Sequence, residues 1–280
     1  MKKVLRTFKE NKQFTLFFIL GLVVIGIAIF APQLSPYDPR NAVMTESLQE
    51  PSSAHPFGTD KLGRDLLSRV IFGTRTSLIM TLCLVAVIFV IGTFLGVIAG
   101  YFGGVVDAVI MRIADMMISF PGLVLAIAIA GMLGPNLVNA VISIAAVSWT
   151  KYARLARSMV LKVKKSLYIE AAIVNGTKTW KILLVHILPN MVTQMVVTAA
   201  ADIGTMMLEL ASLSFLGFGA TAPTPEWGLM LNEGRTYMAK APWLMIYPGI
   251  AIVICVVVFN MLGDLSLIHI SEPTRLRRIS

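Results

Sequence analysis

Hydrophobic residues along this chain gather in long runs that polar segments separate. Most of these runs approach the length of about 20 residues that a helix needs to cross a bilayer. The runs are residues 14–31, 77–102, 116–133, 137–153, 191–217 and 243–262. The run at 137–153 is the weakest, because only the 13 residues 137–149 are uninterrupted, and taken alone it could be a re-entrant segment. The pattern predicts an all-α polytopic membrane protein with six transmembrane helices.

The second run contains a regular glycine spacing. Gly92, Gly96 and Gly100 recur every four residues and therefore lie on one stripe of a helix. Small residues at this spacing allow two helix backbones to approach closely. We expect this stripe to be a helix-packing face rather than a flexible hinge.

Composition supports a membrane protein. Of the 280 residues, 56% are hydrophobic and 14% are charged, and the mean hydropathy is +0.79. The net charge of +9 does not indicate nucleic-acid binding, since the Lys and Arg residues lie between apolar runs. Cys83 and Cys255 lie within such runs, which argues against a disulfide framework. The three histidines lack ligand spacing, so we expect no metal site and no cofactor.

Charge distribution predicts the orientation. Residues 1–13 are basic and precede an apolar run without a clear cleavage site, so we expect an uncleaved first helix at 14–31 and a cytoplasmic N-terminus. Residues 32–76 are rich in proline and glycine and form an expected external loop. Six helices with both termini inside place most of the 24 Lys and Arg residues in the cytoplasm. The five remaining helices form a core over residues 77–264.

Two local ion pairs are expected from sequence proximity. Arg64 lies near Asp60 and Asp65, and a pair with either would order the external loop. Arg112 and Asp115 are three residues apart on one helical face and can pair.

The longest basic segment between apolar runs covers residues 151–190. Apolar residues recur at every fourth position at its start, with basic residues off that stripe; the apolar positions are Leu155, Met159, Val163 and Leu167. This spacing predicts an amphipathic helix at a membrane surface. Further on, Gly176 can close a helix, and a second short helix fits residues 179–187. Pro189 either stops that helix or starts the next membrane helix. The resulting helix, turn and helix would suit the docking of a partner.

This segment resembles the cytoplasmic signature loop of ABC importer permeases. The resemblance rests on Glu170-Ala171-Ala172, on Gly176 four residues later, and on the sequence Ile187-Leu188-Pro189. It implies that the segment couples the membrane helices to a cytoplasmic ATPase. The residues expected to carry this role are Glu170, Ala171, Ala172, Gly176, Leu188 and Pro189.

Other motifs narrow the resemblance to the peptide and nickel branch of these permeases. They lie at residues 55–65, 119–121, 214–219 and 225–231. Over residues 14–264 the chain resembles the second permease of dipeptide, oligopeptide or nickel importers, a type I (MetI-like) transmembrane domain. The resemblance implies a plasma-membrane complex with a sister permease, two cytoplasmic ATPases and an extracytoplasmic binding protein. Residues 265–280 depart from the family pattern, and we interpret them as a foreign or frame-shifted end.

The expected function is that of a peptide-importer permease subunit, with nickel as the alternative cargo. The chain has no phosphate-binding G-x-x-x-x-G-K-[ST] sequence, so ATP hydrolysis would belong to partner subunits. A membrane enzyme such as an intramembrane protease is disfavoured, since neither H-E-x-x-H nor G-x-S-x-G occurs.

Two carboxylates fall within the apolar run at 191–217. Asp202 and Glu209 are seven residues apart and share a helix face, where buried charges are costly without a partner or a cavity. They could line a cargo path or form hydrogen bonds at a subunit interface. A secondary transporter driven by protons through these two residues is a further alternative.

Overall fold

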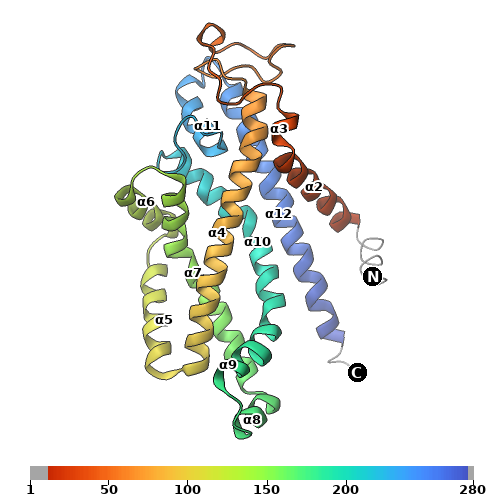
Figure 1. The fold of residues 1–280 in the computed structure, drawn as a ribbon, viewed down its shortest axis with the longest axis vertical. Coiled ribbons are helices and arrows are strands. Elements are labelled where there is room, and N and C mark those ends of the chain that lie inside the picture. The colour runs from red at the N-terminus through yellow and green to blue at the C-terminus, as the bar shows by residue number, and fades with distance from the viewer. Residues whose placement is uncertain (1–11, 277–280) are drawn as a thin grey trace.

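A computed structural model describes residues 12–276 of the chain, with side chains described through residue 265. The described part is built from helices, and the longest of them, α4, α7, α10 and α12, run along one long axis (Figure 1). The elements are α2 (Lys12–Ile29), α3 (Ala31–Leu34), η1 (Met44–Glu46), α4 (Leu66–Phe102), α5 (Gly104–Ile118), α6 (Gly122–Leu133), α7 (Leu137–Lys164), α8 (Leu167–Val174), α9 (Thr179–Lys181), η2 (Ile182–Ile187), α10 (Leu188–Phe215), α11 (Trp227–Gly234), η3 (Arg235–Tyr237) and α12 (Trp243–Leu276). This architecture confirms the expected all-α class.

The helices α4 and α7 pack tightly along the glycine stripe. A Cβ atom added at Gly96 would lie 2.2 Å from the Ala153 carbonyl oxygen, and one at Gly92 would lie 2.5 Å from the Trp149 carbonyl oxygen. At Gly100 the nearest atom would be the Val160 Cβ, at 2.8 Å. The backbones therefore meet where only hydrogen atoms fit, and the predicted packing role of the stripe is confirmed.

The predicted span at 116–133 is wrong as a single straight helix. The chain instead ends α5 at Ile118 and begins α6 at Gly122, and the two helices are bent by 93°. The cause is Pro121, which disfavours helical geometry at Phe120 and has no N–H group to donate.

Ion pairs join α5 to α7. Arg157 Nε lies 2.5 Å from Asp107 Oδ1, and Arg154 Nη2 lies 2.5 Å from Asp115 Oδ1. The expected pair of Arg112 with Asp115 is thus replaced by a pair between helices. Sequence proximity predicted the wrong partner because α7 brings its guanidinium groups alongside α5.

The second half of the bundle pairs α10 with α12, and α2 packs against α12. Glycines again set the approach, since a Cβ at Gly263 would lie 2.2 Å from the Ala201 Cα atom. The short helix α11 begins after Glu226, whose buried carboxylate accepts hydrogen bonds from the Gly228 and Leu229 N–H groups at 2.9 and 2.8 Å. Burial raises the pKa of Glu226, and these two backbone groups oppose the shift.

The polar segment before α4 covers one end of the bundle. Helix α4 begins at Leu66 rather than at residue 77, because the Asp65 carboxylate accepts a hydrogen bond from the Ser68 N–H group and caps the helix. The expected pair of Arg64 with Asp60 is confirmed, with 2.5 Å between Nε and Oδ2. Both Arg64 and Arg69 also reach Glu233 on α11, at 2.9 and 3.1 Å.

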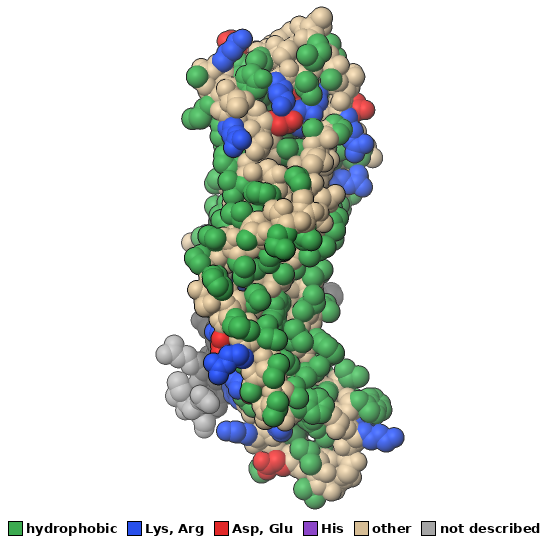
Figure 2. Space-filling model, turned by 90° about the vertical axis from the view of Figure 1, so that its left-hand side faces the viewer, with side chains coloured by type: hydrophobic (Ala, Val, Ile, Leu, Met, Phe, Trp, Pro, Cys, Tyr) green, Lys and Arg blue, Asp and Glu red, His purple; other side chains and the backbone are tan. Residues whose placement is uncertain are grey.

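Four described helical stretches are long and apolar enough to cross a membrane, or five if the bent pair of α5 and α6 counts as one span. They are Lys12–Ile29, Leu66–Phe102, Thr179–Phe215 and Trp243–Leu265. Helix α7 holds the place of the weakest predicted span but is too polar to count among them. On the face in Figure 2, hydrophobic side chains form the middle of the molecule and charged side chains gather toward its two ends. The chain is thus a multi-pass membrane protein.

Two expectations fall largely outside the described residues. The cytoplasmic N-terminus at 1–13 is described only from Lys12, and the atypical tail at 265–280 has described side chains only at Leu265. Both stay predictions.

Candidate functional site

The two-turn helix α8 contains the first part of the predicted coupling segment and lies at one end of the long axis (Figure 1). Ile169 is fully buried and anchors α8 to the main core, whereas Leu167 and Val174 are 83% and 86% exposed. The Asn190 side-chain amide nitrogen lies 3.2 Å from the Tyr168 hydroxyl and ties α8 to the start of α10. One face of α8 is thus held by the bundle, and the rest is exposed.

The predicted amphipathic surface helix before α8 is wrong. Residues 151–164 are the last part of α7, and they continue its packing against α4. The fully buried positions are Tyr152, Ala153, Ala156 and Val160, which lie beside the glycine stripe. The sequence placed the apolar face on Leu155 and Met159, which are only partly buried. The face of α7 that contacts the α4 glycines carries mainly small and aromatic residues, which give a weak hydrophobic periodicity. The larger apolar residues lie on the neighbouring face, so the sequence pattern indicated that face instead.

Gly176 ends α8 in a left-handed turn, as predicted. Its φ is +72°, its N–H group donates to the Ile173 carbonyl at 3.0 Å, and the Thr177 N–H group donates to the Ala172 carbonyl at 3.0 Å. This pair of hydrogen bonds is a Schellman motif, which satisfies two carbonyl groups that the helix end leaves free. The turn sends the chain back toward the bundle.

The structure brings together four of the six residues predicted for coupling. Glu170, Ala171 and Gly176 are exposed on α8 and its turn, and Ala172 is half-buried. The other two, Leu188 and Pro189, lie at the start of α10 instead, with α9 and η2 in between. The two groups of residues are successive parts of one connection rather than a single patch.

The expected separate helix at 179–187 is instead continuous with α10, and Thr179–Phe215 forms one helical stretch. Pro189 lies in the first turn of α10, which confirms the second of the two readings for this proline. The residues before it, Ile182–Ile187, form a π-helical segment. The Asn190 side-chain amide nitrogen donates to the His186 carbonyl at 2.5 Å, near the hydrogen bond that proline cannot make.

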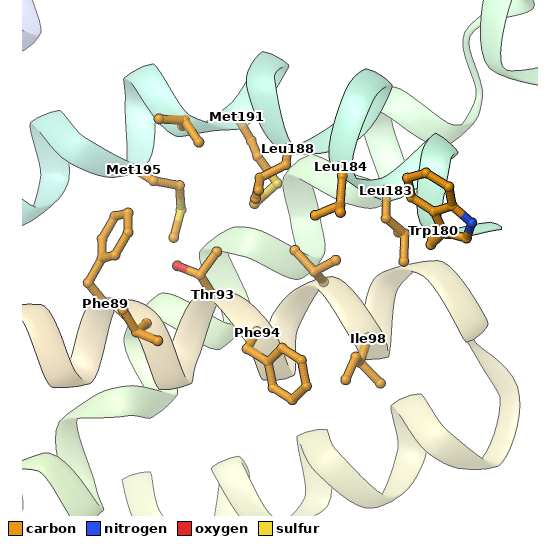
Figure 3. Close-up of a pocket in the computed structure, with 13 residues that line it drawn as sticks. Phe89, Thr93, Phe94, Ile98, Trp180, Leu183, Leu184, Leu188, Met191 and Met195 are labelled. Carbon is orange, nitrogen blue, oxygen red and sulfur yellow. The ribbon is translucent and has the colours of Figure 1, made fainter. Parts of the chain in front are cut away.

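An apolar cavity of about 470 Å³ separates this π-helical segment from α4 (Figure 3). Phe89 and Thr93 line it from α4, Met191 and Met195 line it from α10, and Trp180 lines it from α9. The connection from α8 to α10 therefore has free space on its α4 side. Sharp bends in helices often occur at π-helical segments, and such segments are frequent at functional sites.

The carboxylate pair on α10 lies in the middle of the bundle, beside α7. Asp202 is buried, and its two oxygens lie 2.6 Å from Lys151 Nζ and 2.9 Å from the Tyr152 hydroxyl. Glu209 is half-buried on the same face of α10 and makes no hydrogen bond or ion pair with the residues that the structure describes. The two carboxylates therefore differ: one is paired within the chain and one is not.

Sequence reasoning missed Lys151 and Tyr152 as partners of Asp202. Both residues lie where the predicted span at 137–153 overlaps the basic segment at 151–190, and no sequence pattern linked them to the later helix that contains Asp202. The sequence did offer one signal, which is that Asp202 lies within an apolar run. A carboxylate at membrane depth requires a cationic or hydrogen-bonding partner. Within residues 12–265, no group of three or more His, Cys, Asp or Glu side chains could hold a metal ion.

Comparison with known proteins identifies the class of protein to which this helical arrangement belongs. A solved inward-facing structure of the MetNI methionine ABC transporter has the same fold, with a TM-score of 0.58 and 20% identity over 71% of this chain and 94% of the other. The chain belongs to the family of binding-protein-dependent transport system inner membrane components, whose family model matches residues 92–274. Residues 1–51 match the N-terminal transmembrane domain of oligopeptide transport permease C. The chain is thus a membrane transport subunit of the ABC importer type.

Curated relatives are similar over most of their length. The chain is 43% identical to the dipeptide transport system permease protein of Alkalihalophilus pseudofirmus, over 94% of this chain and 86% of that protein. It is 47% identical to a glutathione transport system permease protein of Pectobacterium atrosepticum, over 87% and 81%. A probable D,D-dipeptide permease of Escherichia coli is 43% identical, over 88% and 83%.

Proposed function

We propose that this chain is one of two permease subunits in an ATP-driven importer of short peptides. The names of its relatives support peptide cargo, since they are permeases for dipeptides and for glutathione, itself a small peptide. A sister permease would supply the other half of the pathway, and an extracytoplasmic binding protein would deliver the cargo. Two cytoplasmic ATPases would hydrolyse ATP, because this chain lacks the loop that holds nucleotide phosphates.

In this proposal the end of the bundle with α8 lies in the cytoplasm. Basic residues concentrate around α8, where Lys162, Lys164, Lys165, Lys178 and Lys181 flank the helix. An excess of Lys and Arg marks the cytoplasmic ends of membrane helices. The loop before α4 and the helix α11 then face the outside, and both termini are cytoplasmic.

The exposure of α8 carries the coupling proposal. Helix α8 is joined to α7 on one side and through η2 to α10 on the other, so a push on it reaches two helices of the bundle. Its free surface presents Glu170 and Ala171 beside strongly exposed apolar side chains such as Val174. A short helix of this kind fits a groove on a partner, and the ATPase movements that follow ATP binding would shift it as a rigid body. Leu188 and Pro189 would transmit that shift at the start of α10.

We further propose that Asp202 and Glu209 face the cargo pathway. Both border a cavity of about 370 Å³ between α10, α7 and the bend from α5 to α6. A cavity in the middle of a transport subunit that presents charged groups among apolar ones suits a path for polar cargo.

The coupling proposal predicts the effect of two substitutions in and beside α8. Gly176→Leu forces a side chain to positive φ, at a cost of about 1 kcal/mol or more, and adds bulk to the docking surface. Glu170→Lys reverses the charge that α8 offers to the ATPase. Each variant should assemble with its sister permease but lose ATP-dependent peptide uptake and the stimulation of ATP hydrolysis by loaded binding protein. Uptake into vesicles and phosphate release are the measurements.

Matched controls separate coupling from folding. Gly217 also has a positive φ, +94°, with nothing within 4 Å of an added Cβ, and it closes α10 with the same pair of hydrogen bonds, but it lies at the end of α10 farthest from α8. Glu50 is exposed in the loop at the opposite end of the bundle. Gly217→Leu and Glu50→Lys should retain most of the uptake. Normal transport by both variants of the α8 segment would refute the coupling role, and uptake that persists without ATP but stops with an uncoupler would indicate a proton-driven transporter.

A further inference from the structure

The cavity beside Asp202 and Glu209 has mixed polar and apolar walls. Asp202, Thr205 and Glu209 border it along one face of α10, and Lys151 borders it from α7. Apolar side chains, Phe120 among them, complete the wall. Its volume of about 370 Å³ falls within the range of small-molecule sites, about 300–1,000 Å³. This chain alone therefore forms a site of the size of a small polar ligand.

The charges in the cavity do not cancel. Lys151 lies at Asp202, where the Nζ–Oδ1 distance is 2.6 Å, so these two groups neutralise each other. Glu209 is seven residues further along α10, which is about 10 Å along the helix axis. It makes no hydrogen bond or ion pair with any residue described in the structure, although it is half-buried. Among the described residues, the cavity thus holds one carboxylate in direct contact with a cation and one, Glu209, that Lys151 affects only from a distance.

The position of Glu209 matches the direction of import in the proposed orientation. Helix α10 runs from the α8 end of the bundle toward the end that carries α11 (Figure 1). Cargo entering from the outer end would therefore reach Glu209 before it reached the pair of Asp202 and Lys151. Thr205 is exposed between the two carboxylates and offers a hydroxyl on the same face.

We propose that Glu209 and Thr205 bind the protonated α-amino group of a short peptide as it passes through the permease. The inference rests on the proposed function and names the part of the cargo that this subunit recognises. An ammonium group is the natural partner of an unpaired, half-buried carboxylate, because the ion pair offsets the cost of removing the carboxylate from water. The apolar wall around Phe120 would contact the first side chain of the peptide.

A cysteine reporter in the cavity tests this proposal. Cys83 and Cys255 are first replaced by alanine, and Ser148→Cys, at another residue that lines the cavity, is introduced into the complete complex of both permeases, the ATPases and the binding protein in proteoliposomes. The rate of alkylation of this chain by N-ethylmaleimide is measured with and without alanyl-alanine, and separately with N-acetyl-alanyl-alanine. Alanyl-alanine should slow alkylation several-fold, and the N-acetylated peptide should not.

Variants of Glu209 then test whether its carboxylate causes the protection from alkylation. Glu209→Gln should abolish the protection by alanyl-alanine, and Glu209→Asp, which retains the charge, should retain part of it. Equal protection by the two peptides, or unchanged protection in Glu209→Gln, would overturn the amine site. A Ser148→Cys that does not react in the assembled complex would also overturn it, because the sister permease would then cover the cavity.

Uptake in the same preparation separates this inference from the proposed function. A complex that imports alanyl-alanine with ATP but shows no amine-dependent protection has the proposed function without this site. A fully assembled complex that imports no short peptide at all would instead refute the proposed function, and the inference would fall with it.

Discussion

At the scale of single residues, glycine decides how closely the helices of this permease approach. The stripe on α4 lies against α7 at distances that leave no room for a methyl group, and Gly204 and Gly263 play the same part between α10 and α12. Apolar burial gives little preference between two helices in a lipid environment, so close van der Waals packing has to select the partner. The glycines thus determine which helices become neighbours.

Adding one methyl group to this stripe should destabilise the bundle. In Gly96→Ala the new Cβ meets the Ala153 carbonyl oxygen at 2.2 Å, so α4 and α7 must separate, at a cost of about 1–3 kcal/mol. Gly249→Ala is the control, because Gly249 is also helical and has nothing within 4 Å of an added Cβ. There alanine should be neutral or stabilising by up to about 1 kcal/mol. The temperature at which the detergent-solubilised complex loses its size-exclusion peak measures the difference, and equal values for the two variants would contradict the packing role.

At the scale of elements, buried charges fasten the loop before α4 to α11. Arg64 and Arg69 have side chains only 1% exposed, and both reach Glu233, whose side chain is 12% exposed. Asp60 accepts from Arg64 on the loop side. Four charges from three segments thus meet in one buried network, and each depends on the others for its partners.

Removing one carboxylate from this network should release the loop. Glu233→Gln leaves two buried guanidinium groups with too little negative charge, which costs about 3–5 kcal/mol when a buried pair is broken. The loop at residues 35–65 should then be cleaved faster by an added protease, as followed by mass spectrometry of the fragments. Glu46→Gln is the control, since the Glu46 side chain is 40% exposed and lies 3.5 Å from the His55 ring. Identical cleavage rates in the two variants would show that the network does not hold the loop.

At the scale of the whole molecule, the two polar ends of the bundle have different tasks in the proposed mechanism. One end carries α8 and the basic residues around it, and the other carries the loop and α11 (Figure 1). The mid-membrane cavity lies between them. A transporter that takes cargo from a binding protein and energy from an ATPase needs these two surfaces on opposite sides of the membrane.

Cysteine labelling tests that arrangement directly. Thr45 and Lys165 are both exposed and lie toward opposite ends of the long axis. In a background without Cys83 and Cys255, Thr45→Cys should react with a membrane-impermeant maleimide in intact cells. Lys165→Cys should react only after the membrane is permeabilised. Labelling of both positions from the same side would refute the proposed topology and, with it, the cytoplasmic coupling role of α8.

The sequence by itself determined the features that depend on local chemistry. Apolar runs identified most of the membrane helices, Gly176 predicted the end of α8, and the glycine spacing predicted a close contact. Four of the residues predicted for coupling lie close together in the chain, on α8 and its turn, so local structure alone brings them together. They are Glu170, Ala171, Ala172 and Gly176. These predictions succeeded because each depends on residues within a few helical turns of one another.

Only the tertiary structure decided which distant groups meet. It assigned Arg154 to Asp115, Arg64 and Arg69 to Glu233, and Lys151 to Asp202. It also turned the predicted surface helix into the end of α7, because the glycine stripe of α4 selects the small residues of that helix as its partner. The pairing of charges over long sequence separations depends on how the helices pack, and a one-dimensional pattern does not contain that information. For the same reason, the sequence does not show that Lys151 pairs with Asp202 and leaves Glu209 without an ion pair among the described residues.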